Sequence, residues 1–291
     1  MRITSSHGRR PRRVRILSVI VTLATIACVL FSWALAVRFE LVPRAYVPGV
    51  AELIGGFETF LFPDPKRNAF SYFAFPQGRG FWVAYGLTAL RLSLALVIGG
   101  VLGIIFGTIA GASAVLRQAG MLWMIFWHDV VPRLLLILYV TSLGISGTHA
   151  AVMIAGLSVF CIVGLTTMVS VQDPELKEQV ESARLETGST ARIMLAVVLP
   201  QKVPMLAIAL SLGATSALSL VYFVEYVQSA AGLGYYLQIA FSSDAKIPEA
   251  VAVTVFGLVL VAAWIGVIFA LARIMPSLLI RLGDACIRRP R

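Results

Sequence analysis

Long apolar runs separated by shorter polar segments dominate the chain. Each run holds 22 residues or more, and together they cover 16–37, 83–111, 119–143, 149–171, 201–224 and 250–275. A helix of about 20 apolar residues crosses the hydrocarbon core of a bilayer, and helices satisfy their own backbone polar groups there. The pattern therefore predicts an all-α, polytopic membrane protein with six transmembrane helices.

The first run, residues 16–37, allows two interpretations. It follows a basic leader, residues 1–15, and Ala34-Leu35-Ala36 resembles a signal-peptide cleavage site. The run is, however, longer than the apolar region of a signal peptide and long enough to span a membrane. We favour an uncleaved first transmembrane helix, followed by an external loop at 38–82.

A polar segment, residues 172–200, interrupts the apolar pattern in the second half of the chain. Asp173 is a candidate N-cap, Pro174 suits the first helical position, and Gly188 suits the position after a helix end. We expect a short capped helix, a glycine turn and a second helical stretch ending at Pro200. Such an insert is either a solvated connection or a docking element for a partner, and its own caps favour docking.

Composition agrees with a membrane location. Of 291 residues 59% are hydrophobic and 13% are charged, and the mean hydropathy is +0.89. A soluble domain carries about a quarter charged residues. The net charge of +10 does not indicate nucleic-acid binding, because the arginines flank apolar runs instead of forming one basic face. The three cysteines form no cluster, so neither a metal site nor a disulfide framework is predicted.

The distribution of Lys and Arg predicts the orientation. With the N-terminus inside, 16 basic residues fall in inside segments and 6 in outside loops, while Arg91 and Arg133 lie within runs. Basic residues favour the cytoplasmic side. Both termini, including a basic tail at 276–291, and the polar segment 172–200 are therefore expected in the cytoplasm.

Polar side chains within the runs or at their ends are candidates for a translocation path, because charge inside a membrane is costly. They are Arg91, Asp129, Arg133 and Glu225. Each also has a structural interpretation. Asp129 and Arg133 are four residues apart and suit an ion pair on one helix face, Arg91 suits snorkelling to the headgroups, and Glu225 suits a hydrogen bond to the turn after it. Two buried arginines would favour an anionic solute.

Glycines recur every fourth residue in the second run, at Gly99, Gly103 and Gly107. This spacing lets another helix approach closely in a membrane. The partner helix belongs either to the same chain or to a second copy.

The polar segment resembles the cytoplasmic signature of permease subunits in ATP-binding-cassette importers. That signature reads Glu-Ala-Ala, three residues, Gly, nine residues, Ile, one residue, Leu-Pro. The matching positions here are Glu181, Ala183, Val197, Leu199 and Pro200. The chain departs from the pattern with Ser182 at the first Ala and Thr187 at the Gly, where Gly188 follows one residue late.

Two further stretches resemble the nitrate/sulfonate/taurine-type branch of these permeases. Residues 220–241 hold Glu225 followed by Gly232-Leu233-Gly234-Tyr235, and residues 88–111 hold Arg91 and the repeated glycines. The resemblance covers the proposed permease core, about residues 83–275.

The resemblance implies an inward transporter of a small solute in the bacterial plasma (inner) membrane, and the two arginines favour an anionic one. Separate ATP-binding-cassette subunits would bind ATP and Mg, and an external solute-binding protein would deliver the solute to a dimer embedded in lipid, expected to be a homodimer, with a heterodimer as the alternative. The residues implied in coupling to the ATPase are Glu181, Ala183, Thr187, Gly188, Leu199 and Pro200.

No lysine of this chain lies in a GxxxxGK[ST] motif, so we expect no ATPase site, cofactor or catalytic residue of its own. The alternative is a secondary active transporter driven by an ion gradient, for which inverted repeats would be typical. None is visible in the sequence. An intramembrane hydrolase is disfavoured because there is no GxSxG-type elbow.

Overall fold

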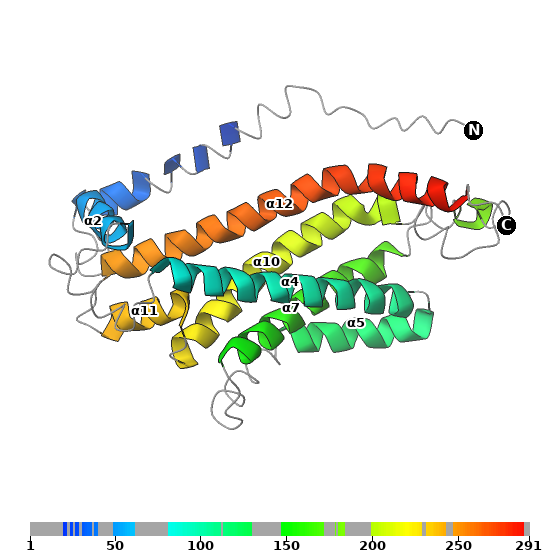
Figure 1. The fold of residues 1–291 in the computed structure, drawn as a ribbon, viewed down its shortest axis with the longest axis horizontal. Coiled ribbons are helices and arrows are strands. Elements are labelled where there is room, and N and C mark those ends of the chain that lie inside the picture. Colours follow the sequence, from blue (N-terminus) through cyan, green and yellow to red (C-terminus); the bar gives the residue numbers. More distant parts are fainter. Residues whose placement is uncertain are drawn as a thin grey trace.

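The structure is a computed structural model that is almost entirely helical where it describes the chain (Figure 1). The described residues are 20–21, 24–25, 27–28, 31–36, 38–39, 49–61, 81–111, 113–129, 147–171, 178, 180–183, 199–228, 231–242 and 247–287. The helices are α2 (Val50–Leu61), α4 (Phe81–Gly111), α5 (Ala114–Asp129), α7 (Gly147–Ser170), α10 (Leu199–Gln228), α11 (Leu233–Ser242) and α12 (Ile247–Ile287).

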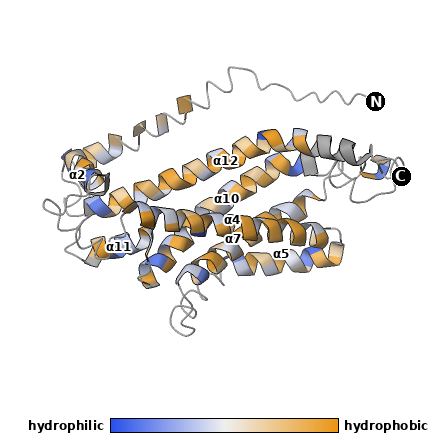
Figure 2. Cartoon of the chain, viewed as in Figure 1, coloured by the Kyte–Doolittle hydropathy of each residue, from blue (hydrophilic) through white to orange (hydrophobic). Residues whose placement is uncertain are grey.

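Four of the described helices are long and apolar enough to cross a membrane. The candidate spans are Phe81–Gly111, Gly147–Ser170, Gln201–Val227 and Pro248–Leu278, and apolar residues cover most of their surface (Figure 2). They confirm four of the predicted runs to within a few residues and agree with an all-α membrane protein.

The other two predicted runs are described only in part. The run at 119–143 corresponds to α5, which begins earlier, at Ala114, and is described as far as Asp129. Of the run at 16–37, the described residues are helical. At the other end of the chain, α12 continues through Pro276 to Ile287, so helix extends well into the segment predicted as a basic tail.

Helix directions show how the chain passes through the bundle. Arg91 bonds Thr148 at one end of α4 and α7, while Gly107 lies against Gly164 further along both helices. The two helices are therefore parallel, and the chain between Gly111 and Gly147 has to return from one end of the bundle to the other. α5 covers the first part of that return, which supports the predicted run at 119–143 as a crossing.

The helix α10 runs antiparallel to both α4 and α7. Val203 lies at the end of the bundle where α4 finishes, beside Ile104 and Met275, and Glu225 lies at the other end, beside Arg91. α12 in turn runs antiparallel to α10, because Tyr222 donates to the Val253 carbonyl at 3.0 Å near its beginning. We call the two ends of the bundle the Glu225 end and the Leu199 end.

The tightest packing joins α4 to α7 through the repeated glycines. A Cβ added to Gly99 would overlap the Gly156 carbonyl oxygen, and one added to Gly103 would lie 2.9 Å from the Phe160 carbonyl oxygen. Absence of side chains at these positions lets the two backbones touch. The predicted close approach is confirmed, and its partner is a helix of the same chain.

Two short helices cover the Glu225 end of the bundle. α2 lies on the start of α12, where Gly56 contacts the Pro248 carbonyl and the rings of Phe57 and Phe256 are 5.5 Å apart. The α11 residue Tyr236 is buried edge-on against Phe81, with ring centroids 5.8 Å apart. Burial raises the pKa of the Tyr236 hydroxyl above its ordinary value, so it stays protonated.

The polar segment is described in part. Residues 180–183 are helical, with Glu181 exposed, in agreement with the predicted first helix. Its predicted cap residues Asp173 and Pro174 lie outside the described residues. The expectation that a helical stretch ends at Pro200 is wrong at its last residues, because α10 begins at Leu199. Proline suits the first turn of a helix, where its missing N–H needs no acceptor.

Candidate functional site

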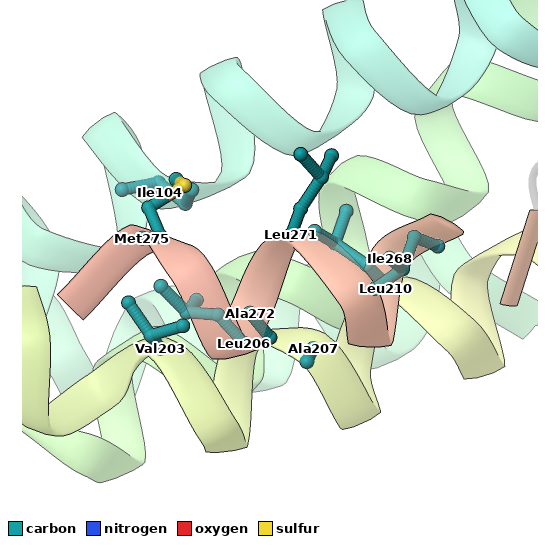
Figure 3. A pocket seen from close by; sticks show the side chains of 9 residues that line it. All are labelled: Ile104, Val203, Leu206, Ala207, Leu210, Ile268, Leu271, Ala272 and Met275. Atoms are coloured by element: carbon teal, nitrogen blue, oxygen red, sulfur yellow. The ribbon is translucent and has the colours of Figure 1, made fainter. Parts of the chain in front are cut away.

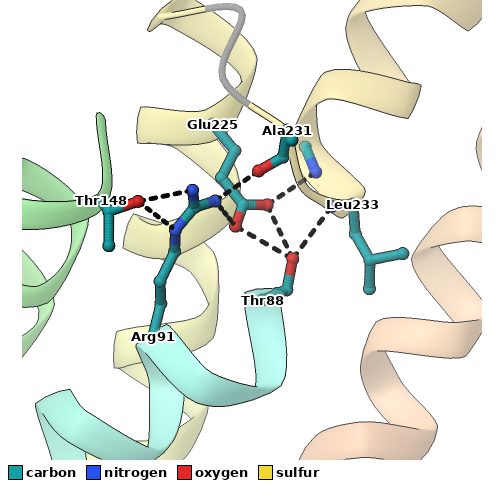
Figure 4. A network of polar contacts seen from close by, with 7 residues as sticks. Thr88, Arg91, Thr148, Glu225, Ala231 and Leu233 are labelled. Atoms are coloured by element: carbon teal, nitrogen blue, oxygen red, sulfur yellow. Dashed lines mark hydrogen bonds and ion pairs between the residues drawn. The ribbon is translucent and has the colours of Figure 1, made fainter. Parts of the chain in front are cut away.

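A buried ion pair joins α4 to α10 at the Glu225 end of the bundle. Arg91 Nη1 lies 2.6 Å from Glu225 Oε1, and the two side chains are 4% and 0% exposed. The structure thus brings together two of the four residues predicted for a translocation path (Figure 4). Snorkelling of Arg91 to the headgroups, one of the structural interpretations, is wrong because its guanidinium points inward to Glu225.

Hydrogen bonds saturate the carboxylate of Glu225. Thr88 Oγ1 lies 2.9 Å from both carboxylate oxygens, and the backbone N–H of Gly234 donates to Oε2 at 2.9 Å. Thr88 Oγ1 also accepts the N–H of Leu233 at 2.9 Å. The predicted hydrogen bond from Glu225 to the turn after it is therefore confirmed, and Thr88 holds the same turn from α4.

Each nitrogen of the Arg91 guanidinium also donates a hydrogen bond. Its Nη1 also donates to the Ala231 carbonyl at 2.6 Å, while Nη2 and Nε donate to Thr148 Oγ1 at 2.8 and 3.3 Å. Thr148 lies in the first turn of α7. One arginine therefore connects α4, α7, α10 and the turn between α10 and α11.

The turn fits the carboxylate only because Gly232 has no side chain. Gly232 has a φ of 155°, and a Cβ there would collide with the carboxylate of Glu225. A Cβ on Gly234 would collide with the Tyr222 carbonyl oxygen. The Gly-Leu-Gly sequence thus lets the backbone close over a buried charge.

This polar cluster, defined by Thr88, Arg91, Thr148, Glu225 and the backbone of 231–234, is a clamp rather than an open binding site. Its two charges neutralise each other, and every charged group bonds protein atoms. A buried pair with all its partners avoids the large cost of an isolated charge in a low-dielectric interior. Arg91 consequently offers no uncompensated charge to an anionic solute.

The remaining predicted path residues are not placed beside this clamp. Asp129 ends α5, its side chain lies outside what the structure describes, and so does Arg133. The predicted Asp129–Arg133 pair stays a prediction. Among the coupling residues, Glu181 and Ala183 lie on the described helical turn and Leu199 and Pro200 begin α10, whereas Thr187 and Gly188 lie outside the described residues.

An apolar groove opens between α4, α10 and α12 towards the Leu199 end (Figure 3). Its volume is about 130 Å³. The lining side chains are Ile104, Val203, Leu206, Ala207, Leu210, Ile268, Leu271, Ala272 and Met275. No polar side chain lines this groove, so it offers no group that would orient a polar ligand.

In the described part of the chain, no group of three or more His, Cys, Asp or Glu side chains lies close enough together to hold a metal ion. ATP and Mg were expected on partner subunits, and this observation does not test that expectation.

Sequence reasoning missed the partnership between Arg91 and Glu225 and the role of the two threonines. One signal was present for Thr88, which lies three residues before Arg91 and thus on the same helix face. Nothing in the sequence pattern pointed to Thr148.

Comparison with known proteins adds no identification. No family model matches the chain, and no curated protein matches it. The resemblance to importer permeases therefore depends on the motif residues alone.

Proposed function

We propose that this chain is the transmembrane permease subunit of an ATP-driven importer that moves a small solute inward by alternating access. Separate cassette subunits bind ATP and Mg, an external binding protein delivers the solute, and two copies of the chain form the pathway in a bacterial inner membrane. Since Glu225 neutralises Arg91, the proposal does not depend on an anionic solute.

The observation that carries the proposal is the geometry of the polar segment. It leaves the bundle after Ser170 and re-enters at Leu199, and both helix ends lie at the Leu199 end. Helices of a bundle are commonly joined by about 2–8 residues, whereas 28 residues join these two. The excess chain includes the exposed Glu181 on a helical turn, as a docking element for a cytoplasmic partner requires.

The clamp supports the proposal from the opposite end. Alternating access needs elements that keep their shape while others move. Arg91 and Glu225 fix α4, α7, α10 and the following turn at the Glu225 end, whereas only apolar contacts line the groove between α10 and α12 near the Leu199 end. Motion delivered to the polar segment would thus reach the end of the bundle that holds the apolar groove and not the clamp.

The test is purification of the tagged full chain from its native host in mild detergent, with co-purifying proteins identified by mass spectrometry. We expect a stoichiometric ATPase that contains a P-loop. Glu181→Lys should reduce its recovery about tenfold, since a reversed charge at a docking contact opposes association. Glu58→Lys is the matched control, because it makes the same change at an exposed position of α2.

Three outcomes would contradict the proposal. One is a chain that purifies alone as a stable oligomer, which would favour the secondary carrier. Another is an ATPase retained equally by Glu181→Lys and wild type, which would remove the polar segment from the contact. A third is equal loss with Glu181→Lys and Glu58→Lys, which would mean that general misfolding, not docking, explains the effect.

A further inference from the structure

The candidate membrane span of α12 is less buried than the other three candidate spans, and one face of it, called here the bare face, packs on no described helix. Only 17% of its candidate span is buried, compared with 39%, 56% and 50% for the spans of α4, α7 and α10. Its exposed large side chains include Val259 (55% exposed) and Ile274 (59% exposed). The other three spans bury a larger share of their residues against neighbouring helices. On α12, by contrast, the face turned away from the bundle is not covered by any described helix.

The centre of that face is flat. Ala262, Gly266 and Ala270 recur every fourth residue and are all exposed, and a Cβ added to Gly266 would meet nothing within 4 Å. Helices in a membrane associate by close backbone contact at small residues. Within this chain the α4 glycines are already used in that way against α7, so the structure shows what the same spacing does when a partner is present.

The apolar run at 16–37 has the matching surface. Ala24, Cys28, Ser32 and Ala36 also recur every fourth residue, and the first three are exposed. At 1.5 Å per residue a helix of this run is about 33 Å long, enough to cross the bilayer beside α12.

The chain connection brings these two surfaces together. Residues 38–49 join the run to α2, and α2 is fixed on the first turns of α12 through Gly56 and Phe57. In Figure 1 the helical pieces of residues 20–39 lead away from α2. A helix that enters the membrane from α2 therefore starts beside the beginning of α12 and lies antiparallel to it.

We propose that the run at 16–37 packs antiparallel on the bare face of α12 in the same chain. One register seats the three exposed small residues of the run on the three of α12, with Cys28 opposite Gly266, Ala24 opposite Ala270 and Ser32 opposite Ala262. The inference concerns the architecture of the chain and does not depend on the proposed transport function.

The native Cys28 makes the contact directly measurable. In full-length chain with Cys161→Ala and Cys286→Ser, Gly266→Cys is introduced and the membranes are treated with a mild oxidant. Disulfides form only when Cα atoms lie within about 7 Å. We expect a disulfide between residues 28 and 266 within one chain, identified as a monomeric species of altered mobility and by mass spectrometry of the linked peptides.

The matched control is Val267→Cys in the same background. Val267 is exposed at almost the same depth but is turned about 100° around the helix axis. We expect its disulfide with Cys28 to form about ten times more slowly, because the Cβ atoms point apart. A second pair, Ala24→Cys with Ala270→Cys and Cys28→Ala, tests the same register if Gly266→Cys fails to insert.

The rates of disulfide formation, and whether the disulfide lies within one chain, decide the outcome. A fast intrachain disulfide in either pair, with a slow control, supports the proposal. A disulfide that forms only between two chains would overturn it and assign this face to a second copy. Equal rates for Gly266→Cys and Val267→Cys, or no disulfide while maleimide labels both thiols of the inserted protein, would also overturn it.

Discussion

At the scale of single residues, the clamp predicts strong coupling between Arg91 and Glu225. Arg91→Met and Glu225→Gln should each destabilise the protein by about 3–5 kcal/mol, because each leaves a buried group without its charged partner. The double variant should lose less than the sum, since no unpaired charge remains. Thermal unfolding of the purified protein in detergent, run as a double-mutant cycle, measures this coupling.

Arg273→Met is the control for that cycle, because Arg273 is exposed on α12. It should change stability by less than about 0.5 kcal/mol. Strict additivity of the Arg91 and Glu225 changes would contradict the clamp.

Gly232 provides a second prediction at this scale. Gly232→Ala should cost at least about 2 kcal/mol, because its φ of 155° suits glycine and its Cβ would meet the Glu225 carboxylate. Gly86→Ala, at an exposed helical position with nothing within 4 Å, should be neutral or stabilising by up to about 1 kcal/mol. Equal unfolding temperatures for the two variants would show that the turn is not held against the carboxylate.

Only part of this site can be predicted from the sequence. Glu225 could be assigned to its following turn because the two are close in the chain, with donor and acceptor 9 positions apart. Arg91 could not be assigned to Glu225, which is 134 residues away. Hydropathy places Arg91 within one apolar run and Glu225 directly after another, but carries no information about which runs are neighbours.

At the scale of helices, the contact between α4 and α7 predicts an asymmetric response to added methyl groups. Gly103→Ala should destabilise the protein by about 1–3 kcal/mol, because the methyl group would press on the backbone of α7 at Phe160. Gly213→Ala, in α10, points at the same α7 but meets Val159 at an ordinary 3.4 Å, and should change stability by less than about 1 kcal/mol.

Detergent unfolding temperatures compare these two variants under identical conditions. A larger loss for Gly213→Ala than for Gly103→Ala would contradict the packing described for α4 and α7.

Helix positions could be predicted more fully than the clamp because the signal is local. Four apolar runs correspond to α4, α7, α10 and α12 within a few residues. The end of α12 was predicted too early, at 275, since Pro276 and the following charges look like a boundary. Pro276 is nevertheless accommodated within the helix. The glycine spacing in α4 predicted close packing, but only the structure distinguishes a partner in the same chain.

At the scale of the whole molecule, the helix directions predict which residues share a side of the membrane. α7 runs from the Glu225 end to the Leu199 end of the bundle, so Ser146 and Lys177, which precede and follow it in the sequence, should lie on opposite sides, with Lys177 in the cytoplasm as the basic residues indicate. In intact cells a membrane-impermeant maleimide should label Ser146→Cys, but should label Lys177→Cys only after permeabilisation.

Lys246→Cys is the control for an outside position and should behave like Ser146→Cys. Labelling of Lys177→Cys in intact cells would contradict the orientation, and labelling of both Ser146→Cys and Lys177→Cys from the same side would contradict a membrane-crossing α7.

The clamp also sets a time order for biosynthesis. Arg91 is made 134 residues before Glu225, and at about 5–20 residues per second the ribosome needs roughly 7–27 s to cover that distance. During this interval α4 carries an arginine whose acidic partner does not yet exist. An arginine without an acidic partner is costly in hydrocarbon, so the ion pair with Glu225 can remove this cost only after α10 has been made.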